Sequence, residues 1–333
     1  FEVTDPSVLL FVVRARADLL RTDTELNEKY CGGRSQFRPP FKLIESIGIQ
    51  KLSQKESHGG QTDRPDTWKE QSTIFDSVAS RFRYLISACL VEQRHSCTEI
   101  IEDINQYVEA DAPKIPNPDE LEYEYWANAY FTFTRLLKPS LFAYSVARDL
   151  VPTESSGNRE KILQWFRTLI IRSEERFPLD YVDSQNKIPL QAGNHFVHSS
   201  LAFMMYGVLA EDHLFFRRGI DQFFLTLSTA RKDGSLPLST RRGNSAISYI
   251  SHNLNSLMTI AEVAQYQGYD LYSMDTNGKT IHDVVGYLLS AYENIDEITP
   301  YAKEDHAPEQ AGKWMEQDLR FDPRDAFGWV DIY

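Results

Sequence analysis

The chain has 333 residues, of which 42% are hydrophobic and 12% aromatic, and this content suffices for a large buried core. Its formal net charge of −13 argues against nucleic acid as a general partner, because phosphate backbones attract basic proteins. No apolar run approaches the roughly eighteen residues of a membrane-spanning helix. We therefore expect a globular protein with neither nucleic acid nor a membrane as its partner.

The first residue and the cysteines bear on where the protein works. The chain begins at Phe1 rather than at methionine, which fits a processed protein whose export signal has been removed, although a trimmed chain would begin in the same way. We therefore expect a secreted or periplasmic location. Three cysteines are too few for a disulfide framework; Cys89 and Cys97 either pair or stay reduced.

Apolar residues recur at three- and four-residue spacing along most of the chain, which predicts amphipathic helices. The predicted helices lie near 5–28, 69–92, 96–110, 119–149, 158–176, 194–210, 213–230, 244–267 and 279–295. Proline, glycine and Asp-Gly or Asn-Gly pairs separate them. The pattern predicts an all-α fold of helical hairpins, in a single domain over 1–333. Because no fixed-period repeat is evident, a closed (α/α) toroid with a central cleft is favoured over a solenoid.

Residues 31–67 break the helical pattern. They are rich in glycine, proline, serine and charged residues, and a loop of this length in a compact domain is usually a lid or a disordered linker. We favour a lid over the cleft, from which Arg34, Arg38 and Lys42 would reach an anionic substrate.

Polar residues gather at the start of the predicted helix near 194–210. Asn194, His195 and His198 lie in its first turns, and a helix N-terminus favours carboxylate binding. A lone helical histidine is more often structural than catalytic, but two histidines and an asparagine at one helix start favour a functional site.

The predicted helix near 244–267 carries a second polar stripe. Tyr249, His252, Asn253 and Ser256 fall at positions i, i+3, i+4 and i+7. A solvent-exposed face would normally carry lysine and glutamate, so neutral hydrogen-bonding residues indicate a wet cavity. The alternative is a buried helix whose polar groups bond to neighbouring backbone. Just before this helix, the segment 231–242 supplies four cations against one anion, and we expect it to make a positive cleft.

Other chemistries fit these residues less well. Three histidines, His195, His198 and His252, offer a zinc site, but no cysteine adjoins them and no glutamate stands in the metalloprotease position. A serine hydrolase would need a Gly-x-Ser-x-Gly elbow, which is missing from the sequence.

A glycoside hydrolase needs two carboxyl groups. The candidates are Asp233, which begins an Asp-Gly pair, and Glu122 or Glu124 near several aromatic residues. Asp-Gly is more often simply a turn.

The region from about 190 to 272 resembles the alginate-lyase family of helical-toroid polysaccharide lyases (polysaccharide lyase family 5 and its glucuronan-cleaving relatives). The likeness is carried by Gly193-Asn194-His195, by Asp233-Gly234-Ser235-Leu236-Pro237-Leu238, by Arg242-Gly243 with Ala246 and Tyr249, and by Gly268-Tyr269-Asp270-Leu271-Tyr272. The chain departs from the family pattern at Phe196-Val197-His198 and at His252-Asn253, where the family binds sugar.

The resemblance implies a cofactor-free and metal-free enzyme that cleaves an anionic polysaccharide, a β-1,4-linked polyuronate such as glucuronan or mannuronate-type alginate, by β-elimination. Tyr249 would act as base and acid with His195 as its partner, while Asn194 and Arg242 would neutralise the uronate carboxylate. We also expect substrate-binding side chains from Arg241, His198, His252, Asn253, Tyr125, Trp126 and Arg34. A helical-toroid glycoside hydrolase and a non-catalytic glycan-binding protein are the alternatives, and the sequence leaves the oligomeric state open.

Overall fold

The computed structural model describes residues 1–31, 38–45, 66–91, 94–114, 123–151, 156–174, 188–302 and 317. Its α-helices are α1 (Val13–Thr22), α2 (Thr24–Cys31), α4 (Asp66–Val91), α5 (Arg94–Glu109), α6 (Tyr123–Leu150), α7 (Ser156–Glu174), α8 (Asn194–Ala210), α9 (His213–Ser228), α10 (Pro237–Thr240), α11 (Ala246–Tyr266), α12 (Ile281–Glu293) and α13 (Thr299–Ala302). Short 3-10 turns lie at η2 (Leu190–Ala192), η3 (Gly243–Ser245) and η4 (Ile295–Glu297). No β-strand forms within these ranges, and the prediction of an all-α chain is confirmed.

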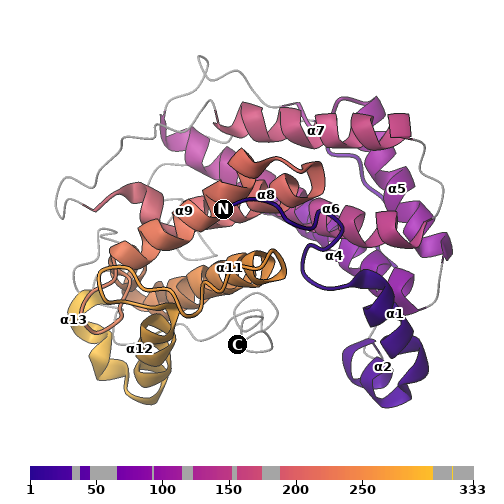
Figure 1. Ribbon diagram of the computed structural model, residues 1–333. Coiled ribbons are helices and arrows are strands. Elements are labelled where there is room, and N and C mark those ends of the chain that lie inside the picture. Colours follow the sequence, from indigo (N-terminus) through magenta and orange to yellow (C-terminus); the bar gives the residue numbers. More distant parts are fainter. Residues whose placement is uncertain are drawn as a thin grey trace.

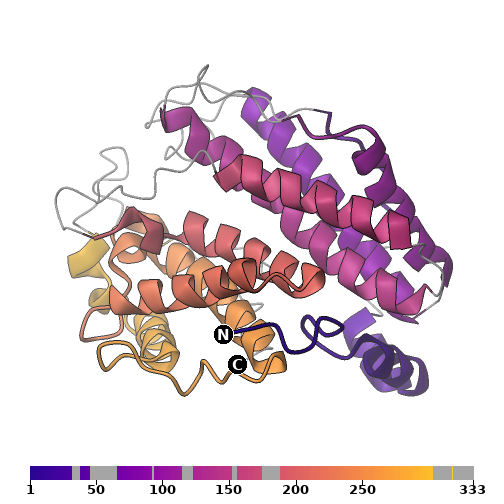
Figure 2. The same ribbon diagram turned by 45° about the horizontal axis from the view of Figure 1, so that its top comes forward.

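The helices form an arc that runs from α1 and α2, over α4 to α7, to α12 and α13 (Figure 1). The long helices α4 to α7 lie together in one half of the molecule, and α8, α9 and α11 to α13 form the other (Figure 2). Helix α8 links the halves, because it packs against α6 and α7 on one side and against α9 and α11 on the other. A helix enclosed in this way is apolar around most of its circumference.

Helices α8 and α9 form an antiparallel hairpin. The Ser200 hydroxyl near the start of α8 lies 3.3 Å from Gln222 Oε1 in the second half of α9. At the other end, Gly207 packs against the backbone of Phe216, where a Cβ atom would lie 2.3 Å from the Phe216 nitrogen. Asp212 caps α9 by accepting hydrogen bonds from the backbone of its first turn.

Helix α11 runs in the same direction as α8. In the first turns of α8, His198 contacts His252 in the second turn of α11 and Ser256 at the midpoint of α11. Near their ends, the ring of Tyr269, just beyond α11, lies 6.1 Å from that of Phe216, which packs on the last turns of α8. The first turns of α8 and α11 therefore lie at the same end of the molecule, and this alignment positions the candidate site.

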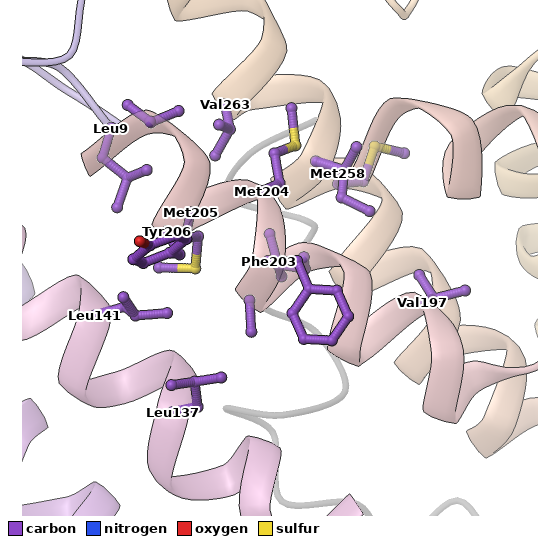
Figure 3. Packing of buried hydrophobic residues seen from close by; sticks show 14 of the residues in the cluster. Leu9, Leu137, Leu141, Val197, Phe203, Met204, Met205, Tyr206, Met258 and Val263 are labelled. Atoms are coloured by element: carbon purple, nitrogen blue, oxygen red, sulfur yellow. The ribbon is translucent and has the colours of Figure 1, made fainter. Parts of the chain in front are cut away.

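The interface of α8 with its neighbours is filled by large apolar side chains. Figure 3 shows Phe203, Met204, Tyr206 and Met258 among them, and Met204 and Met258 are fully buried. Most of the buried hydrophobic residues in the described ranges form one cluster that extends from the N-terminal segment to α13. The single domain over 1–333 stays a prediction.

The N-terminal helix differs from its prediction over 5–28. Residues 1–12 are irregular, and two helices, α1 and α2, are separated at Asp23. The Asp23 carboxylate accepts a hydrogen bond from the Leu26 backbone at 3.0 Å, so this residue begins a new helix. The irregular start is held by Gln267, whose amide binds the backbone of Thr4, Asp5 and Val8.

Cys89 at the end of α4 forms a disulfide with Cys97 at the start of α5. The sequence left open whether these two cysteines pair or stay reduced, and in the structure they pair. The bond ties the two helices together across a short connection.

Of the predicted lid over 31–67, the structure describes Cys31 at the end of α2, residues 38–45 and the start of α4. Residues 32–37, including Arg34, and 46–65 lie outside the described ranges. Residues 38–45 lie along α4 and α5. Arg81 donates to the carbonyl of Pro39 at 2.9 Å, and the Tyr107 hydroxyl donates to that of Lys42 at 2.7 Å. Arg38 forms an ion pair with Glu99 of α5. The lid itself stays a prediction.

Among the described helices, none is both long and apolar enough to cross a membrane.

Candidate active site

The site begins at the first turn of α8. Gly193 precedes the helix in an extended conformation, and Asn194 is its first residue. Asn194 is buried, whereas His195 is partly exposed. The dipole of this helix end favours an anion nearby.

His198, one turn further along α8, lies at a junction of three helices. Its Nδ1 atom lies 2.6 Å from the ammonium of Lys138 on α6 and 2.8 Å from the hydroxyl of Ser256 on α11. An ammonium group can only donate hydrogen bonds. Nδ1 is therefore the accepting nitrogen, and the imidazole proton resides on Nε2.

Burial lowers the pKa of His198 well below its usual range, and the nearby basic groups Lys138, His252 and His195 lower it further. His198 is consequently a neutral imidazole at physiological pH. Its ring lies 6.4 Å from that of His252, which is partly exposed. These two histidines, both expected to bind substrate, thus lie near each other, and their contact with substrate stays a prediction.

Lys138 is a residue of this cluster that the sequence analysis did not identify. It interrupts an otherwise apolar stretch of α6, in which Leu136, Leu137 and Leu141 are completely buried. Pro139 follows it inside the helix and removes one backbone donor. The sequence signal that could have identified Lys138 as a site residue is a lysine next to a proline within an apolar helical stretch.

Arg242 and Tyr249 approach each other at the start of α11. The guanidinium carbon of Arg242 lies 4.7 Å from the centre of the Tyr249 ring, within the range of a cation–π contact. Arg242 also donates through Nε to the carbonyl of Leu238 at 3.3 Å. The Arg-to-Tyr spacing read from the sequence therefore corresponds to a direct contact. Because α8 and α11 run the same way, this pair lies at the end of the bundle where Asn194 and His195 begin α8.

Two of the predicted substrate-binding residues are deeply buried. Asn253 is 1% exposed and donates to the Ser239 hydroxyl at 2.7 Å, which joins α11 to α10. Arg241 is 6% exposed in the segment between α10 and η3. Asn253 thereby braces the segment that carries Arg242, and a direct contact of either residue with substrate stays a prediction.

Gln317 reinforces the same segment from the far end of the chain. Its amide nitrogen donates to the carbonyl of Gly243 at 2.9 Å, and its Oε1 accepts from the backbone of Ile247 at 3.2 Å. The second bond satisfies one of the unpaired N–H groups in the first turn of α11. No local pattern in the sequence indicates this contact, because it joins residues about 70 positions apart.

The Asp-Gly turn before α10 has a structural role. The Asp233 carboxylate accepts from the backbone and hydroxyl of Ser235 at 3.0 and 2.7 Å, and from the Tyr301 hydroxyl at 2.5 Å. Burial opposes ionisation of Asp233, but the hydrogen bonds from Tyr301 and Ser235 outweigh it and lower the pKa. A carboxylate held ionised in this way is a poor general acid. Asp233 therefore fits the turn better than the acid of a glycoside hydrolase.

The positive cleft expected from the four cations of 231–242 stays a prediction, but Arg231 also has a structural role. Arg231 stacks 4.0 Å from the centre of the Tyr301 ring and donates to Thr240 at 2.8 Å, so it supports the turn. The basic groups that act on His198 include Lys138 and Arg135 of α6. Arg135 also forms an ion pair with Asp76 of α4.

Several predicted residues fall outside what the structure describes. Arg34 and Glu122 lie in undescribed ranges, and the side chains of Tyr125, Trp126 and Glu124 at the start of α6 are also outside them. Among the described side chains, no group of three histidine, cysteine, aspartate or glutamate residues is placed to hold a metal ion.

Two surface hollows lie away from these residues. One is at the α8–α9 turn, beside Asp212 and Arg217, and the other lies between Val13 and Arg148. Neither is lined by residues of the cluster around His198. The central cleft therefore stays a prediction.

Residues 145–298 match the alginate lyase family. This range contains α8, α11 and the predicted catalytic residues. A protein of Stenotrophomonas maltophilia (strain K279a) described as a polysaccharide lyase is 25% identical over 158 residues, which cover 47% of this chain and 45% of that protein. The match thus spans about half the length of that relative. The predicted resemblance to alginate-lyase-like polysaccharide lyases is confirmed.

The fold of the alginate lyase relatives is also shared. The structure of alginate lyase A1-III from Sphingomonas species A1 has a TM-score of 0.76 and 19% identity, and the match covers 99% of this chain and 88% of that one. A tyrosine-to-phenylalanine variant of alginate lyase A1-III, complexed with a tetrasaccharide, has the same TM-score with 20% identity over the same shares. A histidine-to-alanine variant, also with a tetrasaccharide, has a TM-score of 0.75. These matches confirm the toroid fold.

Proposed function

We propose that this protein is a polysaccharide lyase that cleaves β-1,4-linked polyuronates, glucuronan or mannuronate-type alginate, by β-elimination. The observation that carries the proposal is the Arg242 guanidinium against the Tyr249 ring, at the end of the bundle where Asn194 and His195 begin α8. A guanidinium, a phenol, an amide and an imidazole are the groups needed to hold a carboxylate and to move a proton beside it.

In the proposed reaction, Asn194 and Arg242 bind the carboxylate of the sugar to be cleaved. The hydrogen on C5 is poorly acidic while that carboxylate is fully charged. Each well-placed hydrogen-bond donor would stabilise the enolate-like intermediate by about 3–4 kcal/mol. Tyr249, beside the Arg242 guanidinium, would then remove H5 as the general base.

The bond changes balance within the sugar chain. Tyr249 takes the C5 proton, the electrons of that C–H bond form the C4–C5 double bond, and the C4–O bond to the neighbouring sugar breaks. In β-linked mannuronate and glucuronate, H5 and O4 lie on one face of the ring. Tyr249 can therefore return its proton to the leaving oxygen, and the net reaction needs no water, metal or cofactor.

The similar solved structures support these roles. Two tetrasaccharide complexes of alginate lyase A1-III carry, respectively, a tyrosine-to-phenylalanine and a histidine-to-alanine substitution. These are the residue types that we assign to proton transfer and to its partner. The Cys89–Cys97 disulfide supports our further proposal that the protein works in the periplasm or outside the cell, where disulfides persist.

One assay tests the proposal against its alternatives. The protein is incubated with polyglucuronate, polymannuronate and other polyuronates, and the ultraviolet absorbance of the new C4–C5 double bond is followed together with reducing ends. We expect both signals to rise together. Reducing ends without absorbance would identify a hydrolase, and binding without either signal would identify a glycan-binding protein.

A further inference from the structure

The cluster around His198 has a consequence for substrate binding that goes beyond the proposed reaction. We propose that Lys138 is a second carboxylate-binding residue, which holds the uronate carboxylate of a sugar adjacent to the one that is cleaved. This inference rests on the proposed function, because it takes a polyuronate as the ligand.

The first argument is the position of the ammonium group. Lys138 reaches from α6 to the Nδ1 atom of His198 at 2.6 Å, one helical turn from His195. It is partly exposed, as are His195 and His252, whereas His198 between them is buried. An incoming anion would therefore meet Lys138 rather than the His198 ring.

The second argument is that the ammonium group is fixed in place. His198 accepts through Nδ1, and the Ser256 hydroxyl lies 2.8 Å from the same atom. A lysine side chain normally loses considerable conformational entropy when it binds an anion. Here the contact with a buried imidazole has already restricted the side chain, so less entropy remains to be lost.

The third argument is the sign of the local charge. The groups that act most strongly on His198 are Lys138, His252, His195 and Arg135, all of which are basic. A protein with a formal net charge of −13 needs such a local reversal to bind a polyanion. A polyuronate carries one carboxylate on every sugar, so a chain held at Arg242 presents further carboxylates to its surroundings. Lys138, on a different helix from Arg242, supplies a cation for one of them.

The experiment measures binding without turnover, in a Tyr249→Phe background. Calorimetry with a short oligoglucuronate or oligomannuronate is performed at several salt concentrations on Lys138→Gln and Lys138→Arg. Glutamine keeps a donor for His198 but removes the charge, and arginine keeps the charge. The matched control is Lys161→Gln, at an exposed position of α7.

We expect Lys138→Gln to weaken binding about tenfold, as the loss of one charge-assisted hydrogen bond would, and to reduce its salt dependence. Lys138→Arg should restore most of the affinity, and Lys161→Gln should have no effect. With a carboxyl-reduced oligosaccharide, the difference in affinity between the Tyr249→Phe parent and its Lys138→Gln variant should vanish. A purely structural role of Lys138 would lower the thermal stability without changing the salt dependence.

The possible failures are distinguishable. If wild-type protein cleaves polyuronates while Lys138→Gln binds within about twofold of its parent at every salt concentration, the inference is overturned and the proposed function stands. If no polyuronate is either bound or cleaved, both are overturned.

Discussion

At the scale of single residues, the site consists of common residue types, and the contacts between their side chains set them apart. Tyr249 is one of 17 tyrosines in the chain, and the guanidinium of Arg242 beside its ring distinguishes it. His198 is distinguished by burial and by the ammonium on its Nδ1 atom. Chemical function at this scale therefore follows from neighbours rather than from residue type.

Substitution of Tyr249 tests the assignment of the proton-transfer residue. Tyr249→Phe removes only the hydroxyl and keeps the ring on which Arg242 stacks. We expect kcat on polyuronates to fall by at least about three orders of magnitude, because the residue acts as both base and acid. The thermal unfolding temperature should stay within about 2 °C of wild type. A variant that retains near-full activity would rule out the assignment.

The neutral state of His198 predicts a pH dependence of stability. Its pKa is depressed in the folded protein, chiefly by burial, so below a pH of about 6.5 the unfolded chain takes up a proton that the folded chain does not. The free energy of unfolding should therefore fall as the pH is lowered, by up to about 1.4 kcal/mol per pH unit from this residue.

Urea unfolding at about pH 7.5 and about pH 5.5 measures this contribution. Between these two pH values, the free energy of unfolding of His198→Gln should fall by roughly 1.4 kcal/mol less than that of wild type. Substitution of the exposed His95 should leave the fall the same as in wild type. Equal losses for wild type and His198→Gln would show that His198 is not held neutral.

At the scale of elements, the parallel course of α8 and α11 determines which residues meet. Both helices begin at the same end of the molecule, and the short segment from α10 to η3 delivers Arg242 there. This segment is held by a turn at Asp233, by Asn253 on α11 and by Gln317. The contacts come from three separate parts of the chain, which explains why a motif of only a few residues needs a large scaffold.

Gly234 offers a test of how tightly this turn is packed. Its φ is +88°, and a Cβ atom there would lie 2.1 Å from the carbonyl oxygen of Asp283 on α12. Gly268 has nearly the same φ, +87°, with no atom near its Cβ position. Gly268→Ala should therefore cost only the backbone strain, about 1–2 kcal/mol, and Gly234→Ala should cost at least about 2 kcal/mol more, because α12 must shift.

Chemical unfolding of the two variants gives the comparison directly. Lyase activity should decrease more for Gly234→Ala than for Gly268→Ala, since the displaced turn leads to Arg242. Equal stability of the two variants would mean that α12 does not pack on the turn as described.

At the scale of the whole molecule, the two halves meet along α8, and the disulfide lies in the half formed by α4 to α7. Cys89 and Cys97 join the end of α4 to the start of α5, on helices that contribute none of the proposed catalytic residues. Loss of the disulfide should therefore lower the stability of the protein without changing its catalytic activity.

Replacement of both cysteines by serine tests whether stability changes while activity does not. The loop closed by the bond is short, with a sequence separation of 8, so its loss should lower the free energy of unfolding by roughly 2–3 kcal/mol. Activity under conditions where the protein stays folded should not change. Adding a reductant should destabilise wild type but not the double variant; the same response in both would indicate that the cysteines are not paired in solution.

The sequence by itself determined the helical architecture and the identity of the four proposed catalytic residues. Helices α4 to α9, α11 and α12 lie within a few residues of their predicted ranges, because apolar spacing and the proline and glycine residues between helices are local properties. The Asn-His pair and the Arg-to-Tyr spacing were likewise visible, since each lies within a short stretch of chain.

The tertiary structure alone decided which stretches meet. Lys138 and His198 are 60 positions apart, and Gln317 reaches back 74 positions to Gly243; neither contact leaves a periodic trace. Arg231 likewise has a role that no local pattern indicates, because its guanidinium stacks on an aromatic ring from α13. The periodicity of apolar residues indicates which face of a helix is buried. Which other helix packs on that face depends on how all the helices pack together. For this reason the chemistry of the site could be anticipated, whereas the charge that surrounds it could not.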